Sequence, residues 1–118
     1  MGMALKADLI KATLISGSDK PIDLVYLSSM TMGDKTLEAE VLQMFCSQLP
    51  LYFSQLECEQ DIRTVKTIGH TLKGAARSVG ALRMAELAEE YEVYGNGKHA
   101  DLVREGKRIE QYVRTLYN

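Results

Sequence analysis

Apolar residues recur along most of this 118-residue chain at spacings of three and four, which place them on one side of an α-helix. No stretch alternates apolar and polar residues for long enough to indicate a half-buried strand. The spacing predicts helices at about 4–15, 22–31, 35–57, 62–80, 82–94 and 100–117. We therefore expect an all-α fold, an antiparallel up-down four-helix bundle with short additional helices at the N-terminus.

Turn-forming residues separate the predicted helices. Residues 16–21 are rich in turn formers, Gly33 ends the second helix, and Asp34 is a good N-cap for the third. Pro50 lies inside the third helix, but the apolar stripe keeps its phase across it, which favours one kinked helix over two separate ones. The sequence GNGKH at 95–99 is the clearest loop in the chain.

The expected core consists of the apolar residues that share the inner face of each helix. They are Ile22, Tyr26, Leu27 and Met30; Leu37, Val41, Phe45, Leu49, Tyr52 and Leu56; Ile62, Val65, Ile68, Gly69, Leu72, Ala76 and Val79; Met84, Leu87, Ala88 and Tyr91; and Leu102, Ile109, Val113 and Leu116.

Length and charge limit the classes of function. The chain suits one bundle domain at 21–118, preceded by an extension at 1–20 whose Met1-Gly2 start looks like a cloning scar. A net charge of −2 argues against general binding to nucleic acid or to anionic membranes. No segment is apolar enough for a signal peptide or a membrane span, and Cys46 and Cys58 have no second ligand pair nearby. We expect a cytoplasmic protein with reduced thiols and no metal of its own.

The helix at 62–80 carries the most informative pattern. With Val65 at zero on a helical wheel, His70 lies about 140° away on the solvent side. Arg63, Lys66, Lys73 and Arg77 occupy the same side, and no acidic residue occurs between positions 61 and 86. A cluster of cations around one histidine in an acidic protein favours an anionic partner.

The residue types around His70 suit phosphoryl chemistry. An exposed imidazole is substantially neutral near pH 7 and can act as a nucleophile. Lys73, one turn on, can neutralise charge on a phosphoryl group, and Gly74 leaves the approach to the imidazole uncrowded. The same pattern also fits a solvated histidine with Gly74 as a helix-packing contact, and close packing of a neighbouring helix is sufficient to explain Gly69.

The stretch HTLKGAARSVGA at 70–81 resembles the motif of histidine phosphotransfer (HPt) domains, the carriers of two-component phosphorelays. Matching positions are His70, Leu72, Lys73, Gly74, Ala75, Ala76, Gly80 and Ala81, followed by Met84, Ala85, Leu87, Ala88, Tyr91 and Glu92. The similarity extends over about 21–117, although Gly69 stands where alanine is common, and Met84 and Tyr91 replace leucines.

The resemblance implies that His70 accepts a phosphoryl group on Nε2 from an aspartyl phosphate of one receiver domain and passes it to the aspartate of another. Lys73 would steady that group, and Gly74 would leave room for the receiver. Candidates for further contact with the phosphoryl group or the receiver are Lys66, Thr67, Arg77 and Arg63. A hybrid sensor histidine kinase would start the relay, and the receiver would supply Mg²⁺. The chain has no Gly-rich nucleotide signature, so we expect a monomeric carrier with no kinase activity.

Two other classes of function stay open on the sequence. One is a regulator of the same fold that binds receivers without being phosphorylated, and the other is an unrelated helical adaptor or a small basic-face nucleic-acid binder.

For several residues we expect an ordinary structural role in preference to a functional one. His99 is expected to be an ordinary loop histidine, Glu86, Glu89, Glu90 and Glu92 a solvated helix face, and Met30 and Met32 part of the core in preference to a docking patch.

Overall fold

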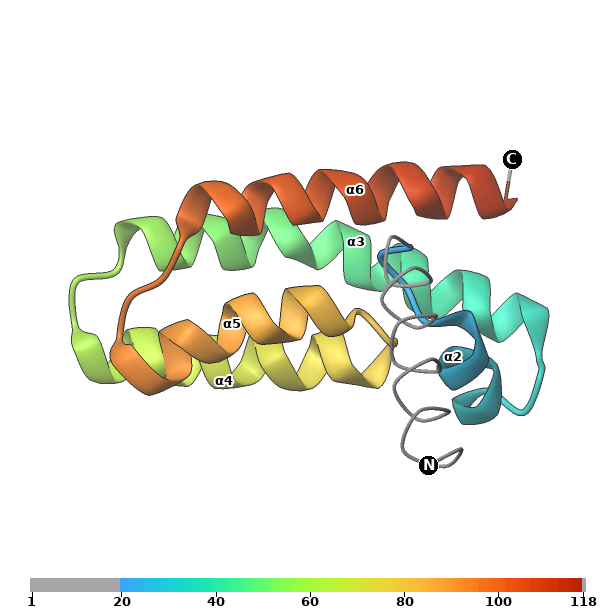
Figure 1. Ribbon diagram of the computed structural model, residues 1–118, viewed down its shortest axis with the longest axis horizontal. Coiled ribbons are helices and arrows are strands. Elements are labelled where there is room, and N and C mark those ends of the chain that lie inside the picture. The colour runs from blue at the N-terminus through green and yellow to red at the C-terminus, as the bar shows by residue number, and fades with distance from the viewer. Residues whose placement is uncertain (1–19, 118) are drawn as a thin grey trace, which may run out of the picture.

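The computed structural model describes residues 20–117 and contains helices only in that range. The helices are α2 (Leu24–Met30), α3 (Lys35–Cys58), α4 (Ile62–Ser78), α5 (Leu82–Tyr94) and α6 (His99–Tyr117) (Figure 1). The prediction of an all-α bundle is confirmed. The helix expected at 4–15 and the proposed extension at 1–20 lie outside the described residues, except for Lys20.

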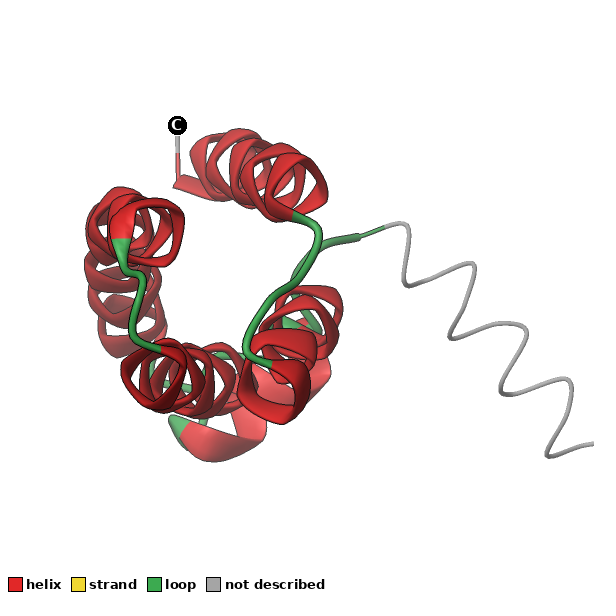
Figure 2. Cartoon of the chain, turned by 90° about the vertical axis from the view of Figure 1, so that its left-hand side faces the viewer, coloured by secondary structure: helices red, strands yellow, loops and turns green. Residues whose placement is uncertain are grey.

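The four long helices form a ring around a common core. Helix α3 packs against α4 and α6, and α5 packs against the same two helices, so each helix has two neighbours (Figure 2). The α4–α5 contact is the most extensive of these. The short helix α2 lies at the end of the bundle where the α4–α5 turn is found (Figure 1).

Three of the helices have an aspartate as their N-cap, and each aspartate side chain accepts a hydrogen bond from a backbone N–H of the first turn. Asp23 caps α2, Asp34 caps α3 as predicted, and Asp61 caps α4. Such a cap typically stabilises a helix by about 1 kcal/mol. Pro50 lies inside a continuous α3, which confirms the single-helix interpretation, and Gly95 ends α5 in the left-handed conformation at φ 74°.

Most predicted core residues are buried, but four of them are largely exposed. Tyr26 and Met30 on α2, Leu37 on α3 and Ile62 on α4 keep between 38% and 60% of their surface exposed. Helix α2 contacts the bundle on one side only, and in the first turn of α3 the neighbouring Glu38 is buried while Leu37 is exposed. Ile62 lies in the first turn of α4, where its side chain is close to Gly95 at the end of α5. Leu42, which was not predicted, is completely buried in α3.

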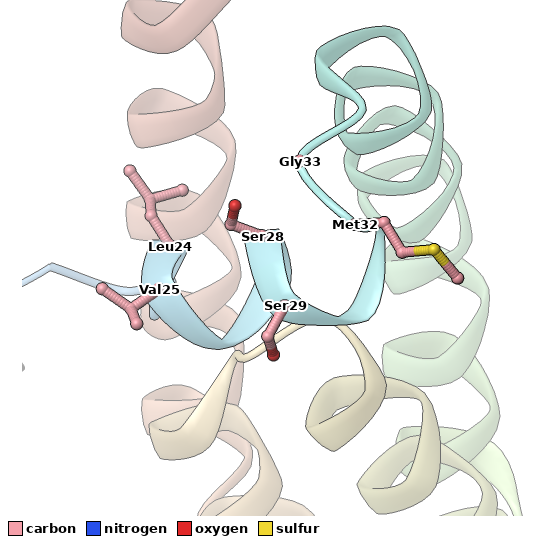
Figure 3. A pocket seen from close by; sticks show the side chains of 6 residues that line it. All are labelled: Leu24, Val25, Ser28, Ser29, Met32 and Gly33. Carbon is pink, nitrogen blue, oxygen red and sulfur yellow. The ribbon is translucent and has the colours of Figure 1, made fainter.

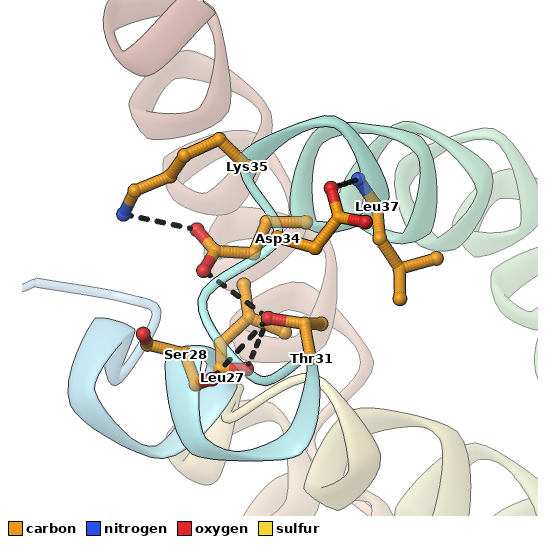
Figure 4. Close-up of polar contacts among 7 residues, drawn as sticks. Leu27, Ser28, Thr31, Asp34, Lys35 and Leu37 are labelled. Atoms are coloured by element: carbon orange, nitrogen blue, oxygen red, sulfur yellow. Dashed lines mark hydrogen bonds and ion pairs between the residues drawn. The ribbon is translucent and has the colours of Figure 1, made fainter.

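Polar contacts attach α2 to the start of α3 (Figure 4). The hydroxyl of Thr31 donates to the carbonyl of Leu27 at 3.0 Å and to the buried carboxylate of Glu38 at 3.2 Å. Lys35 Nζ lies 3.4 Å from the other oxygen of Glu38. This buried carboxylate occupies the inner position that the periodicity assigned to Leu37, which explains why the apolar stripe is out of phase there.

The outer side of α2 is apolar and faces solvent. Val25 and Met32 line a shallow depression with Leu24, Ser28, Ser29 and Gly33 (Figure 3). Met32 is 94% exposed and Met30 is 56% exposed, so the expectation that these methionines belong to the core is wrong. Met32 has a positive φ of 53°, a backbone conformation that side-chain-bearing residues rarely adopt.

Neither cysteine in the described range forms a disulfide. Cys46 is half-buried and Cys58 is exposed, and both lie on α3. Burial, followed by the nearby charge of Glu110, raises the pKa of the Cys46 thiol. Within residues 20–117, no helix combines the length and the apolar character that a membrane crossing requires.

Glu105 on α6 is buried and its carboxyl group is incompletely paired. One oxygen accepts a hydrogen bond from Arg108 Nη1 at 2.6 Å, and Oε2 has no hydrogen-bond partner among the described residues. Burial raises the pKa of this carboxyl although Arg108 and Arg83 oppose the shift. The charged form is therefore disfavoured in the folded protein.

Replacing Glu105 with glutamine tests this conclusion through the pH dependence of stability. Because the pKa of Glu105 is higher in the folded than in the unfolded state, the folded state binds more protons at pH values between the two pKa values. The contribution of Glu105 to stability therefore falls as the pH rises from the unfolded-state pKa through the folded-state pKa. We expect the unfolding free energy of Glu105→Gln, relative to the natural chain, to increase from acid to neutral pH. Urea unfolding at several pH values measures this difference, and a difference independent of pH would contradict it.

Candidate functional site

His70 projects from the middle of α4 into solvent beside α5. Its side chain is 68% exposed, as the helical wheel predicted. The residue before it, Gly69, is buried, and an ideal Cβ built there would lie only 2.6 Å from the backbone nitrogen of Glu92 and 2.9 Å from Tyr91 Cβ. A glycine at this position therefore allows the backbone of α5 to approach α4 closely, directly beneath His70. This confirms close helix packing as the explanation for Gly69.

Glu92 of α5 orients the imidazole ring. His70 Nδ1 lies 2.6 Å from Glu92 Oε2. An ionised carboxylate can only accept hydrogen bonds, so Nδ1 carries the proton of this bond. In the neutral ring, Nε2 is then unprotonated and has its lone pair available on the solvent side. The geometry selects the tautomer that leaves Nε2 unprotonated.

The same carboxylate also holds Lys73. The Lys73 ammonium forms a close ion pair with Glu92 Oε1, and the Lys73 side chain is only 15% exposed. Lys73 first, and His70 second, lower the pKa of the Glu92 carboxyl through hydrogen bonding, although partial burial opposes them. Glu92 therefore remains ionised at neutral pH and fixes both residues on the same face of α4.

Among the acidic residues of α5, the expectation of a fully solvated face is wrong for Glu92. It is 26% exposed and bridges His70 and Lys73, while Glu89 lies 3.8 Å from Arg77 and Glu90 lies 3.3 Å from Lys98. Sequence reasoning assigned no role to Glu92, because the rotation of α5 about its own axis decides which glutamate faces α4. Its place in the HPt-like stretch was the only available signal.

The four candidate contact residues surround His70 without touching it. Arg77 has only the long contact with Glu89, and Arg63 and Lys66 form no ion pair with any residue of the range 20–117. The Thr67 hydroxyl donates to the Arg63 carbonyl at 3.0 Å, which holds it against its own helix. Within that range, no group of three or more metal-ligating side chains is placed to hold a metal ion.

Gly74 lies one turn beyond His70 on the exposed side of α4. An ideal Cβ built at Gly74 meets no atom within 4 Å. Within residues 20–117, no neighbouring helix approaches Gly74, so the alternative of a helix-packing contact there is wrong. The open space above Gly74 adjoins the imidazole, which is what the prediction of an uncrowded approach requires.

We expect alanine substitutions at Gly69 and at Gly74 to change the stability of the protein in opposite directions. At Gly69 the added methyl group forces α5 away, and overpacking of this kind costs about 1–3 kcal/mol. Alanine is favoured over glycine in a helix by about 1 kcal/mol, which partly offsets the overpacking at Gly69. We therefore expect the unfolding free energy to fall by on the order of 1 kcal/mol in Gly69→Ala and to rise by about 0.5–1 kcal/mol in Gly74→Ala. Denaturant unfolding measures both, and a stabilised Gly69→Ala would contradict the close approach.

His99 differs from its expected place in a loop. It is the first residue of α6, and its Nε2 lies 3.0 Å from the backbone carbonyl of Phe53 in α3. A ring N–H donated to that carbonyl ties the start of α6 to α3. The residue contributes to the bundle structure and lies apart from the His70 face.

Comparison with known proteins agrees with this geometry. The family model of the Hpt domain matches residues 40–117, which contain His70, Lys73, Gly74 and Glu92. No curated protein and no solved structure matches the chain. Hpt domains are phosphotransfer carriers that work with receiver and kinase partners in two-component signalling, and they are not kinases. With a match over most of its length, an all-helical bundle and an exposed histidine on α4, the chain belongs to the Hpt domain family and takes part in histidine phosphotransfer.

Proposed function

We propose that the protein relays a phosphoryl group between the aspartates of receiver domains through a phosphorylated His70. The observation that carries this proposal is the orientation of the imidazole. The Nδ1–H group donates a hydrogen bond to the Glu92 carboxylate over 2.6 Å, and Nε2 of the exposed ring is left unprotonated. An exposed, correctly protonated nucleophile is the requirement for attack on an acyl phosphate.

In the forward step, the Nε2 lone pair forms a bond to phosphorus while the bond between phosphorus and the receiver's aspartate oxygen breaks. The electron pair of that bond leaves with the carboxylate, so no external proton, oxidant or nucleotide is needed. In the return step, the carboxylate of a second receiver attacks phosphorus and the N–P bond breaks. Nδ1 keeps its proton throughout, held by Glu92.

Lys73 and Gly74 support this transfer in different ways. The Lys73 ammonium is adjacent to the ring and can neutralise charge on the phosphoryl oxygens as it moves from His70 to the receiver. The space above Gly74 admits the receiver's surface. The Mg²⁺ ion is bound by the carboxylates of the receiver, because Mg²⁺ prefers oxygen ligands of that kind.

The protein acts stoichiometrically, as a carrier, and as a monomer. The four long helices close one core without a second chain, which supports the monomer. A hybrid sensor histidine kinase charges the first receiver from ATP, and this chain takes the phosphoryl group only from aspartyl phosphates. The proposal includes no binding to nucleic acid or to membranes, in keeping with the net charge of −2.

Phosphoryl transfer from purified, phosphorylated receiver domains to the natural chain and to His70→Gln tests the proposal. We expect an acid-labile, base-stable phosphoryl group on the natural chain and none on His70→Gln, with helical content unchanged. Far-UV circular dichroism checks the fold of the variant. Tight binding of receivers without any labelling would instead establish a regulator that binds receivers without being phosphorylated.

A further inference from the structure

An acidic row lies on the exposed surface of α5, the helix that packs against α4. It consists of Glu86 and Glu89, which are three residues apart and therefore share one face of the helix. The Glu86 side chain is 69% exposed and the Glu89 side chain is 47% exposed. Glu92, three residues beyond Glu89, faces α4 and is engaged with His70 and Lys73.

A basic row runs along the exposed side of α4 that carries His70. It consists of Arg63, Lys66 and Arg77, which lie within about 40° of His70 on the helical wheel. Arg63 and Lys66 have no ion-pair partner within residues 20–117, and both are exposed. The face around His70 is therefore divided lengthwise into a basic half on α4 and an acidic half on α5.

The two rows neutralise each other only weakly. Arg77 and Glu89 are 3.8 Å apart with 57% and 47% of their side chains exposed, and Glu86 pairs with Arg83 of its own helix at 3.3 Å. Exposed pairs of this kind contribute little to stability, so a docking partner can replace them easily. Both rows are consequently available to a partner that carries the complementary charges.

We propose that this division orients the docked receiver, an inference that rests on the proposed function. The receiver places the acidic rim of its phosphorylation pocket over the basic row and a segment rich in lysine or arginine over the acidic row. A receiver that is acidic on both sides of its pocket meets like charges at Glu86 and Glu89. Complementary charges speed association with the correct partner, and like charges reject the others.

Charge reversal of the acidic row tests the proposal. The double variant Glu86→Lys/Glu89→Lys is compared with Glu40→Lys/Glu110→Lys, which has the same net charge change on the exposed surfaces of α3 and α6. The probes are phosphorylated receiver domains, half with lysine or arginine beside the pocket and half with acidic residues there. Stopped-flow association rates are measured at low and at high salt.

For receivers with basic residues beside the pocket, we expect association with Glu86→Lys/Glu89→Lys to slow by about 10-fold at low salt and to recover at high salt. Receivers with acidic residues there should bind this variant faster, and the control should show neither pattern. Association unchanged in both groups, with His70 still phosphorylated, would overturn the orientation proposal and leave the proposed function intact. If no receiver phosphorylates His70, the proposed function fails and this inference fails with it.

Discussion

Glu92→Ala is expected to slow phosphoryl transfer to His70 by about 10- to 100-fold, by analogy with the loss of a hydrogen-bond partner that orients a metal-ligating histidine. The variant loses the acceptor for the Nδ1 proton, so the ring samples both tautomers and a fraction of the molecules carries its proton on Nε2. It also leaves Lys73, whose side chain is only 15% exposed, without its counter-charge. Transfer rates from a phosphorylated receiver measure the combined effect.

Two further variants separate these contributions. In Glu92→Gln the side-chain oxygen can still accept from Nδ1, so the tautomer is retained while the negative charge is lost, and an intermediate rate is expected. Glu90→Ala is the matched control, because Glu90 is on the same helix but pairs with Lys98 at 3.3 Å, away from His70. Nitrogen NMR of the imidazole provides a readout that a general loss of structure would not reproduce. An unchanged tautomer and rate in Glu92→Ala would remove Glu92 from the mechanism.

Features that depend on neighbours in the sequence could be predicted without a structure. Asp34 as an N-cap, the continuous helix across Pro50 and the buried stripe of α4 all follow from helix geometry within one segment. The exposure of His70 follows from the same arithmetic, because a helix that buries Val65 and Leu72 must turn residue 70 outward. These are local consequences of a period of 3.6 residues.

Features that depend on two helices could not be predicted in this way. The bridge from Glu92 to His70 and Lys73 requires the relative rotation and close approach of α4 and α5, which no spacing within α4 specifies. The exposure of Ile62 and Met30 likewise depends on where a neighbouring helix ends. The basic face expected around His70 is therefore only half of the actual surface, since α5 supplies the acidic half.

Gly74→Gln is expected to slow phosphoryl transfer by about 100-fold, because displacing reacting groups by about 1 Å can cost this much. The glutamine side chain would occupy the space above Gly74 that is empty within the protein, so the folded chain itself meets no clash. Helix propensity favours glutamine over glycine, and the unfolding free energy should stay the same or rise. Transfer rates and denaturant unfolding are measured on the same preparation.

A series of substitutions at Gly74 distinguishes obstruction of the receiver from damage to the site. Gly74→Ala adds one methyl group and should slow transfer less than Gly74→Gln, while both keep the His70 tautomer because Glu92 is untouched. Transfer that falls with side-chain size while stability does not fall would mean that the space is needed by the partner alone. Equal rates for glycine, alanine and glutamine would show that the receiver approaches His70 from another direction, and the glycine would then have no role in transfer.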